Sequence, residues 1–358
     1  MDERQEPQHK RRIHYSGKYP RRFEEKYKEL DPEKYGETVA HVRAKGNTPA
    51  GTHIPIMVKE ILGVLAIKPG ERGFDATLGY GGHTQAMLSE LQGKGCLYSG
   101  DIDPIESAKT EARLRGLGYD EAIWQVRHMN FCEIDKLAAE VGPFDFVLAD
   151  LGVSSMQIDN PARGFTYKAD GPLDLRLNPQ AGMSAAERLA GMAEDEIEYM
   201  LIENADEPYA AEIARQIVRD KKRGRKIETT RQLHEAVEKA LARVKLPKNE
   251  NGEKPDRRKL IQKSSARTFQ ALRIDVNNEF EVLYEFMEKL PEALAPGGRA
   301  AILTFHSGED RIVKKAFKAF YGQGVYAEIA RDVIRPGREE CYANPRAHST
   351  KLRWAVKA

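Results

Sequence analysis

The stretch FDATLGYGGHT, residues 74–84, decides how the fold of this chain is interpreted. It passes from an apolar start through Asp75 into a loop that contains Gly79, Gly81 and Gly82, and then into a helix-like run. Glycine readily adopts positive φ and lets the backbone approach a ligand closely. We therefore interpret the stretch as a strand, a ligand-binding loop and the start of a helix.

Segments on both sides of this loop alternate between strand and helix patterns. Short apolar runs typical of buried strands are followed by longer runs with apolar residues at helical spacing. The strand patterns cover residues 71–79, 96–104, 122–130 and 144–152, and the helix patterns cover residues 58–67, 83–92 and 104–116. Strands that alternate with helices form βαβ units with a parallel sheet. The sequence therefore predicts an α/β protein with a Rossmann-like sheet.

The alternation breaks off at about residue 158 and later resumes with a helix, a Pro-Gly-Gly turn and a strand. Between these points the pattern is mainly helical, with basic linkers at 221–226 and 247–263. An insertion inside one domain explains this order better than two domains in tandem. We therefore predict one α/β domain in two parts, residues 52–157 and 266–358, with a helical insertion at 158–265.

Residues 1–51 form an N-terminal extension with few aliphatic residues. Its stretch KRRIHYSGKYPRR, residues 10–22, carries six Lys or Arg residues and two tyrosines without an acid. Cations interleaved with aromatic rings suit a nucleic-acid backbone and its bases. A solvated tail has the same composition, so both interpretations stay open.

The composition is that of a globular protein with a sizeable core, since 41% of the 358 residues are hydrophobic and 31% are charged. The net charge of +2 indicates no global basic field, so any signal for nucleic acid must be local. The three cysteines form no metal-ligand spacing and favour a reducing compartment. No apolar run reaches the ~18 residues of a membrane span, and the charged N-terminus lacks the apolar core of a signal peptide. We expect a cytoplasmic protein without a membrane span.

The glycine loop and the next strand together make a candidate nucleoside site. In an open parallel sheet, ligands bind beyond the carboxyl ends of the strands. Asp101 ends the second strand 19 positions after Gly82, close to the ~20 expected of an acid that binds ribose hydroxyls. Nicotinamide dehydrogenases share this pattern, but the loop reads GYGGH rather than GxGxxG, and the later LAPGGRAAILTF is typical of a methyltransferase sheet. His83 either touches the ligand or only caps or packs the helix.

Several longer stretches of the chain resemble the bacterial 16S ribosomal RNA (cytosine-N4)-methyltransferases, the MraW family. They are HIPIMVKEIL from residue 53, DATLGYGGHT from 75, LADLGVSSMQID from 148, RGFTYKADGPLDLR from 163, ARTFQALRIDVNNE from 266 and LAPGGRAAILTFHSGEDRIVK from 294. The resemblance covers residues 53–358 and leaves the extension outside it. The family's HSLEDR reads HSGEDR here, with Gly308 in place of leucine, which allows a divergent paralogue acting on another RNA cytosine.

The resemblance implies a class I methyltransferase sheet with S-adenosyl-L-methionine as the methyl donor. Phe131 would pack against adenine, Asp101 would bind the ribose, and Gln157 would offer a donor and an acceptor together. The donor site carried over from the family is Gly81, Gly82, His83, Asp101, Phe131, Asp150 and Gln157. Without the family, plain core packing is the stronger interpretation of Phe131.

The implied reaction is methylation of a cytosine N4 amine in 16S rRNA or the small ribosomal subunit. This amine is a poor nucleophile because its lone pair is delocalised into the ring, so positioning and electrostatics must carry the reaction. DNA amino-methyltransferases use an Asp/Asn-Pro-Pro-aromatic turn after the fourth strand, where this chain reads DLGV. Asp150 is the first candidate for the catalytic acceptor, and His306 at the end of the fifth strand is the second.

Basic residues in and around the insertion are the candidates for RNA contact. They are Arg163, Lys168, Arg176, Arg267, Arg273 and Arg311. Phe165 or Tyr167 could stack on a base that is splayed from its strand. As an alternative, several of these arginines pair with nearby acids such as Asp170, Asp174 and Asp310.

Other functions stay open from the sequence. A nicotinamide-dependent dehydrogenase would share the loop and Asp101 but leaves the helical insertion unexplained. An RNA-binding ribosome-assembly factor of the same fold could keep the donor motifs without turnover, and a DNA amino-methyltransferase would need the missing Pro-Pro-aromatic turn. The acids and the histidine of HSGED lack any further ligand spacing, so no metal is expected. The family also allows a homodimer.

Overall fold

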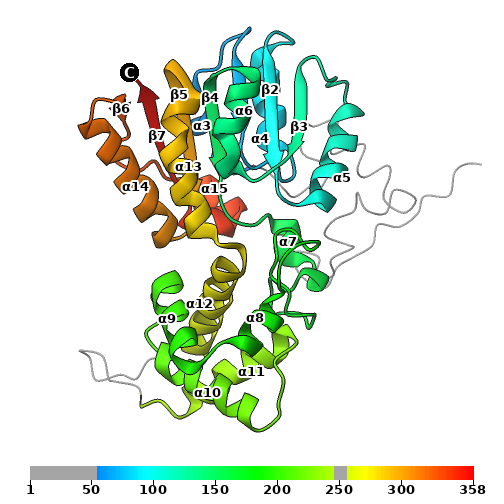
Figure 1. The fold of residues 1–358 in the computed structure, drawn as a ribbon, viewed down its shortest axis with the longest axis vertical. Coiled ribbons are helices and arrows are strands. Elements are labelled where there is room, and N and C mark those ends of the chain that lie inside the picture. Colours follow the sequence, from blue (N-terminus) through cyan, green and yellow to red (C-terminus); the bar gives the residue numbers. More distant parts are fainter. Residues whose placement is uncertain (1–54, 246–255) are drawn as a thin grey trace, which may run out of the picture. The chain divides into compact units, whose positions relative to one another are not determined.

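The computed structural model describes residues 55–245 and 256–358, and the predicted extension at 1–51 lies outside them. Its central element is a seven-stranded sheet in the order β3-β2-β1-β4-β5-β7-β6 (Figure 1). The strands are β1 (Arg72–Asp75), β2 (Cys96–Asp101), β3 (Trp124–His128), β4 (Phe144–Asp150), β5 (Leu294–Thr304), β6 (Tyr326–Ile329) and β7 (Lys351–Lys357). Neighbouring strands from β3 to β5 are parallel, whereas β7 runs antiparallel to β5 and β6. The predicted Rossmann-like α/β class is confirmed.

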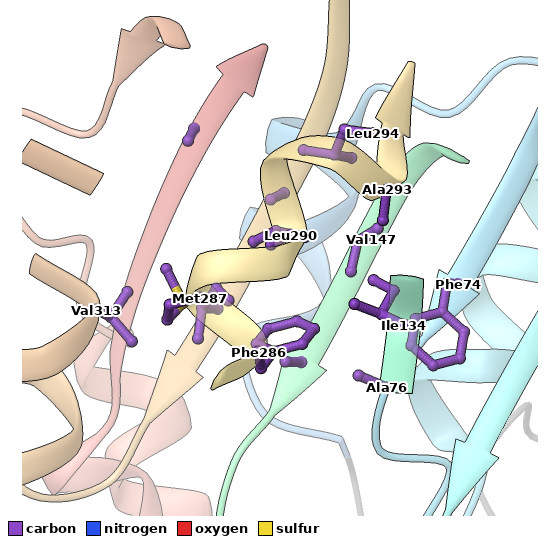
Figure 2. Packing of buried hydrophobic residues seen from close by; sticks show 14 of the residues in the cluster. Phe74, Ala76, Ile134, Val147, Phe286, Met287, Leu290, Ala293, Leu294 and Val313 are labelled. Carbon is purple, nitrogen blue, oxygen red and sulfur yellow. The ribbon is translucent and has the colours of Figure 1, made fainter. Parts of the chain in front are cut away.

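Helices cover both faces of this sheet, and each face has its own cluster of buried residues. The helices are α3 (Val58–Leu65), α4 (Gly82–Leu91), α5 (Pro104–Arg115), α6 (Ile134–Val141), α13 (Glu279–Ala293) and α14 (Ser307–Gly322). On one face, α6, α13 and α14 contribute Ile134, Phe286 and Val313 (Figure 2). On the other face, α3 and α4 contribute Ile61 and Met87. Burial on both faces is what the continuous apolar runs of the strands predict.

Strand β4 shows how one apolar run serves both faces of the sheet. Phe144 and Val147 lie in the cluster under α13, whereas Phe146 and Leu148 lie in the opposite cluster. The alternation is interrupted after Phe144 because the register between β4 and β5 shifts there. The predicted Pro-Gly-Gly turn lies inside β5 at this irregularity, between residues 294 and 299. The turn therefore acts as a bulge at the start of the strand, as glycine in a strand often does.

A second group of helices follows β4 and has a core of its own. It contains α7 (Ser155–Asp159), α8 (Ala185–Gly191), α9 (Glu194–Ala205), α10 (Ala210–Lys222), α11 (Thr230–Ala242) and α12 (Arg257–Asn277), and the short α15 (Arg338–Ala343) precedes β7. Figure 1 shows α8 to α12 gathered together. Their buried side chains include Leu189, Ile197, Ile213 and Leu233. Within the described ranges, every helix is too short or too polar to cross a membrane.

Helix α12 differs from the sequence-based expectation. Residues 257–263 were expected in a basic linker, but they form the first two turns of α12, which Asp256 caps at its N-terminus. Phe269 and Leu272 of the same helix pack in the core of the helical group. A domain boundary at residue 265 would therefore cut a single helix. We propose to place the boundary at Asn278, where a left-handed backbone conformation separates α12 from α13.

A buried carboxylate, Asp103, connects the sheet to the helical group. Its Oδ1 caps the N-terminus of α5 by accepting the backbone N–H groups of Ile105 and Glu106. Its Oδ2 accepts from Arg163 Nη1 at 2.8 Å and from Gln157 Nε2 at 2.9 Å. Both donors belong to the segment that leads from β4 into the helical group. The end of β2 and the entry to the insertion therefore share one carboxylate.

Arg163 also holds the following segment of the insertion. Its Nη2 donates to the backbone carbonyls of Arg176 and Leu177, at 3.0 and 2.9 Å. The residue is 8% exposed, and Asp103 is 1% exposed. A buried guanidinium needs both a charge partner and further acceptors, and this one has both.

Loss of the Arg163 side chain should destabilise the fold far more than loss of an exposed arginine. Arg163→Ala leaves Asp103 buried without its counter-charge, which typically costs about 3–5 kcal/mol. Arg311→Ala is the matched control, because Arg311 and Asp206 form an exposed ion pair worth at most about 1 kcal/mol. Urea unfolding of both variants measures the difference, and equal destabilisation would contradict the central role of Arg163.

Candidate active site

The glycine loop predicted from the sequence lies at the carboxyl end of β1. Gly81 has a φ of 68° and forms the N-cap of α4. A Cβ atom at Gly81 would lie 2.7 Å from Thr110 Cγ2, and one at Gly82 would lie 2.3 Å from Pro55 Cγ. Both positions therefore require glycine, the first for its conformation and both for close packing.

Asp75, at the end of β1, forms hydrogen bonds with residues on both sides of this loop. Its buried carboxylate accepts the Thr84 hydroxyl at 2.6 Å and the Thr77 backbone N–H at 3.2 Å. Burial raises the pKa of Asp75, although the Thr84 hydrogen bond opposes the shift. The Thr77 hydroxyl in turn accepts the backbone N–H of Asp150 at 2.7 Å. The glycine loop and the end of β4 are thus tied together.

Asp101 lies at the end of β2, where the sequence predicts an acid that binds a ribose. Its Oδ2 accepts the backbone N–H of Gly79 at 2.7 Å, and its Oδ1 accepts that of Asp103 at 2.8 Å. Burial raises the pKa of Asp101 to about 6, although these two hydrogen bonds oppose the shift. Each carboxylate oxygen keeps a second lone pair, and the residue stays partly exposed. Asp101 can therefore support the loop and accept from a ligand at once.

His83 and Asp150 meet between the glycine loop and the end of β4. His83 Nε2 lies 2.9 Å from the backbone carbonyl oxygen of Ile56, and because this oxygen only accepts, Nε2 is the donor. His83 Nδ1 lies 3.4 Å from Asp150 Oδ2. Burial alone would lower the pKa of His83, but the Asp150 carboxylate and the Ile56 carbonyl raise it overall. This arrangement favours an imidazolium that holds one oxygen of Asp150.

The other oxygen of Asp150 is the unusual atom of this site. Asp150 Oδ1 is buried and has no hydrogen-bond partner among the described residues. Buried polar atoms are nearly always paired in native proteins, so an orphaned one requires an explanation. A ligand that donates an N–H or O–H at this point would supply the missing partner.

Phe131 and Gln157 occupy different environments from one another. The Phe131 ring, in the short 3₁₀ helix Phe131–Glu133, packs edge-to-face on Phe286 at a centroid distance of 5.1 Å and stays partly exposed. Gln157 uses both ends of its amide within the protein, because Oε1 accepts the Ser154 backbone N–H and Nε2 donates to Asp103. In this structure Phe131 offers a free ring surface, whereas Gln157 fixes the segment after β4.

His306 lies just beyond β5 and caps α14. Its Nε2 lies 2.9 Å from Glu309 Oε1, and its ring packs at 5.8 Å from that of Phe280. A Cβ at Gly308 would lie 2.6 Å from Phe280 Cζ. The Phe280 ring therefore fills the space that a side chain at Gly308 would need.

An acidic group beside His306 brings metal-ligand atom types together. Ligand atoms of Glu279, His306 and Glu309 lie within 4.8 Å of one another. Arg273 donates two hydrogen bonds to Glu279, at 2.7 and 2.8 Å. Burial alone would raise the pKa of Glu309, but the hydrogen bond and charge of His306, followed by the charge of Arg273, lower it overall. The guanidinium of Arg273 thus supplies positive charge to this group. Asp310, included with His306 and Glu309 in the sequence analysis, instead binds Arg353.

Three of the six arginines and lysines predicted to contact RNA are engaged inside the protein. Arg163 binds Asp103, and Arg273 binds Glu279. Arg176 binds Asp174 through Nε and Nη2, which is the local pairing that the sequence left open. These three side chains form internal ion pairs in this structure, and their contact with RNA stays a prediction.

The other three predicted basic residues face solvent to differing degrees. Lys168 is exposed in the loop before α8. Arg267 is partly exposed, with Nη1 3.7 Å from the buried Glu207. Arg311 pairs with Asp206 at 3.4 Å rather than with Asp310.

Tyr167 packs against residues of the helical group, and Phe165 is partly buried. The Tyr167 ring stacks on His234 at 4.6 Å with an interplanar angle of 11°, and its hydroxyl lies 3.3 Å from the carbonyl oxygen of Gln262. Phe165 lies under the Arg163 guanidinium at 5.7 Å. The base-stacking role suggested for Tyr167 would require these interactions to break.

Sequence reasoning missed Asp103, although a signal was present. The run DIDP places an acid directly before a proline at the first turn of a helix, which is typical of an N-cap. The pairing of Asp103 with Arg163, 60 positions away, had no local signal.

Comparison with known proteins places the chain in a family. The model described as the MraW methylase family matches residues 50–358, which leaves residues 1–49 of the extension outside the match. The chain is 62% identical over 99% of both chains to "Ribosomal RNA small subunit methyltransferase H 1" of Agathobacter rectalis, and 57% identical over the full length of both to "Ribosomal RNA small subunit methyltransferase H 2" of Alkaliphilus metalliredigens. It is 38% identical, over 86% of this chain and 98% of the relative, to "Ribosomal RNA small subunit methyltransferase H" of Thioalkalivibrio sulfidiphilus. The chain belongs to the MraW methylase family.

Proposed function

We propose that this protein transfers a methyl group from S-adenosyl-L-methionine to the N4 amine of a cytosine in small-subunit ribosomal RNA. Family membership supports methyl transfer, and the names of the relatives support the RNA class. The observation that carries the assignment of the site is the buried, unpartnered Oδ1 of Asp150 beside the glycine loop, which has no partner among the described residues. Such an acceptor suits an amine whose N–H groups become stronger donors as the nitrogen is methylated.

The residues around the loop fit the proposed donor. Gly81 and Gly82 let the loop pack closely against Thr110 and Pro55 at the carboxyl end of β1, and Asp101 retains lone pairs for the ribose hydroxyls. The partly exposed Phe131 ring suits the adenine. When bound, the sulfonium of the donor supplies an electrophilic methyl group.

Asp150 and His83 have different roles at the reacting amine. As the bond from N4 to the methyl carbon forms and the bond from that carbon to the donor sulfur breaks, the amine nitrogen would gain the positive charge that the sulfonium loses, and S-adenosylhomocysteine would be the leaving group. Asp150 Oδ1 accepts an N–H of this amine, stabilises the charge and takes the departing proton either directly or through water. His83 keeps Asp150 Oδ2 occupied, so that Oδ1 is the oxygen left for the substrate. His83 is thus a positioning residue in this proposal.

Asp150→Asn should lower kcat by about 10²–10³-fold, a reduction typical of removing one preorganised polar group from a transition state. Donor affinity is measured separately, because Asp150 also belongs to the donor site that the family resemblance implies and contacts His83 of α4. Transfer of labelled methyl to small ribosomal subunits lacking the modification, followed by nucleoside mass spectrometry for N4-methylcytidine, measures this.

His306→Asn is the comparison, and it should retain more activity than Asp150→Asn. The reverse order would move the acceptor role to His306. Donor binding by the wild-type chain without any transfer would favour the assembly-factor alternative. Label in another RNA cytosine would favour the divergent paralogue.

Donor affinity should fall as pH is lowered through about 6. The pKa of Asp101 is raised to about 6 in the free protein, and ribose hydroxyls that donate to its carboxylate favour the ionised form. Above this pH the carboxylate is ready to accept, whereas below it a proton must leave first, which weakens binding by up to about tenfold per pH unit.

Calorimetric titration with S-adenosylhomocysteine between about pH 5 and 8 tests this dependence. The variant Asp101→Asn should bind S-adenosylhomocysteine more weakly than wild type above pH 6. Below pH 6 its affinity should no longer decrease as the pH is lowered. If the affinity of Asp101→Asn still decreases with pH as in wild type, another group is responsible for the pH dependence, and His83 is the next candidate.

The loop around Lys168 is our proposed RNA contact. Pro172 forms an isolated bridge with Thr229, so this loop lies beside the start of α11. Tyr167 connects it to Gln262 of α12. Exposed or partly exposed basic side chains from these three segments are Lys168, Arg231, Lys263 and Arg267. Arg231 lies 3.7 Å from Asp170 and Arg267 lies 3.7 Å from Glu207, whereas Lys168 and Lys263 have no ion pair among the described residues. The proposed contact is therefore local, as the small net charge of the chain requires of any RNA-binding region.

Replacing Lys168, Lys263 or Arg267 by alanine should weaken RNA binding. For each phosphate that the variant no longer neutralises, the slope of log affinity against log salt concentration should also decrease in magnitude by about one. Filter binding of small-subunit rRNA at several salt concentrations measures the slope. Lys94→Ala is the control, because Lys94 lies before β2, at the amino end of the strand. A slope that falls equally in the control would contradict a local RNA surface.

The small ribosomal subunit as substrate and the cytoplasm as site of action follow from the same proposal. The homodimer stays a prediction, which light scattering of the full chain tests.

A further inference from the structure

A groove at the C-terminal end of α12 is used by neither the donor site nor the proposed RNA contact. It has a volume of about 550 Å³ and is lined by α8, α9, the end of α12 and the start of α13. Its floor contains Met192, Met200 and Ile274, each of which is nearly fully buried. This size is within the usual range of about 300–1,000 Å³ for binding sites.

The walls of this groove are acidic. Four carboxylates line it, those of Asp195, Glu196, Asp275 and Glu281, against one guanidinium, that of Arg188. Arg188 binds Asp275 with Nε 2.7 Å from Oδ2, so its charge is largely committed. Asp195 and Glu281 form no ion pair within the described residues. The groove therefore carries uncompensated negative charge.

The sequence of α9 extends the same negative character beyond the groove. The helix reads EDEIEYMLIENA, with five carboxylates and no lysine or arginine. Tyr199 of this helix lines the groove and is 68% exposed. An exposed aromatic ring amid carboxylates binds cations through its face as well as through the neighbouring charges.

These features select one kind of occupant. A phosphate backbone is repelled by the carboxylates, which excludes RNA as the fitting partner. An acidic segment is repelled for the same reason. A lysine or arginine side chain is attracted by the walls and by Tyr199, and adjacent apolar side chains fit the methionine-lined floor, which adapts to differing shapes.

We propose that this groove docks a basic segment of a partner protein, in which lysine or arginine alternates with apolar residues. The inference goes beyond the proposed function and does not depend on methyl transfer. It gives a methyltransferase that acts on RNA a separate place to bind a cationic polypeptide. The association is electrostatically complementary, so it should weaken as salt increases.

Binding of a fluorescent synthetic peptide to the purified full chain tests the proposal. The probe is a peptide of about 14 residues made of lysine, arginine and leucine, and fluorescence anisotropy reports its affinity. The triple variant Asp195→Asn, Glu196→Gln, Glu281→Gln should bind about tenfold more weakly, as expected when three exposed charges are removed. Glu196→Gln keeps an oxygen that can accept the Ala193 backbone N–H and thereby preserves the cap of α9.

A matched triple variant controls for overall charge. Glu121→Gln, Glu238→Gln and Glu339→Gln remove three exposed carboxylates outside the groove, and the affinity should stay close to wild type. Tyr199→Ala should weaken binding without changing net charge, and thermal melting checks that each variant is folded.

Three outcomes would overturn the proposal. The first is an equal decrease in affinity in both triple variants, which would indicate non-specific attraction. The second is equal affinity for a glutamate-rich peptide of the same length. The third is displacement of the basic peptide by a short single-stranded RNA that depends on the groove. If the RNA displaces the peptide from wild type and from the matched control variant, but not from the groove variant, the groove would be assigned to RNA.

Discussion

The buried ion pair between Arg163 and Asp103 is the constraint on which the arrangement of this protein depends. Asp103 is two residues beyond the acid that ends β2, and Arg163 belongs to the segment entering the helical group. Two buried charges are tolerated only because each has further hydrogen-bond partners. The pair therefore fixes the segment that enters the helical group against the start of α5, just beyond the carboxyl end of β2.

The carboxyl edge of the sheet concentrates acids, and each is compensated in a different way. Asp75 is held by a hydroxyl and a backbone N–H, Asp101 by two backbone N–H groups, and Asp103 by an arginine. Asp150 alone among these four keeps a buried oxygen without a partner in the described residues. Among these four, Asp150 therefore offers a buried oxygen that has no hydrogen bond within the described part of the chain, whereas Asp101 can accept from a ligand only through lone pairs beside its existing bonds.

The sequence predicts what depends on local periodicity and misses what depends on distant pairing. The strands follow from short apolar runs, and the helices between them follow from apolar residues at a spacing of about 3.6. The glycine loop and Asp101 follow from their places at strand ends and from the 19 positions between Gly82 and Asp101. The pairing of Arg176 with Asp174 could be anticipated from the sequence because the two residues are only two positions apart. The role of Arg163 was not, because its partner is 60 positions away. The start of α12 was not predicted because its basic composition resembles a linker. Its helix is stabilised by the Asp256 cap and by packing of Leu260 and Ile261 against the core of the helical group, which the local sequence does not reveal.

Helix α12 carries opposite charge environments at its two ends. Arg267 and Lys263 lie toward its N-terminal half, whereas Asp275 lines the acidic groove near its C-terminus. Eight residues separate Arg267 from Asp275, which corresponds to about 12 Å along a helix. At 0.1 M salt the Debye length is about 10 Å, so the two fields are largely independent. A net charge of +2 therefore conceals two surfaces of opposite sign. The two proposals together place RNA beside the first half of α12 and a cationic polypeptide beside its C-terminal end.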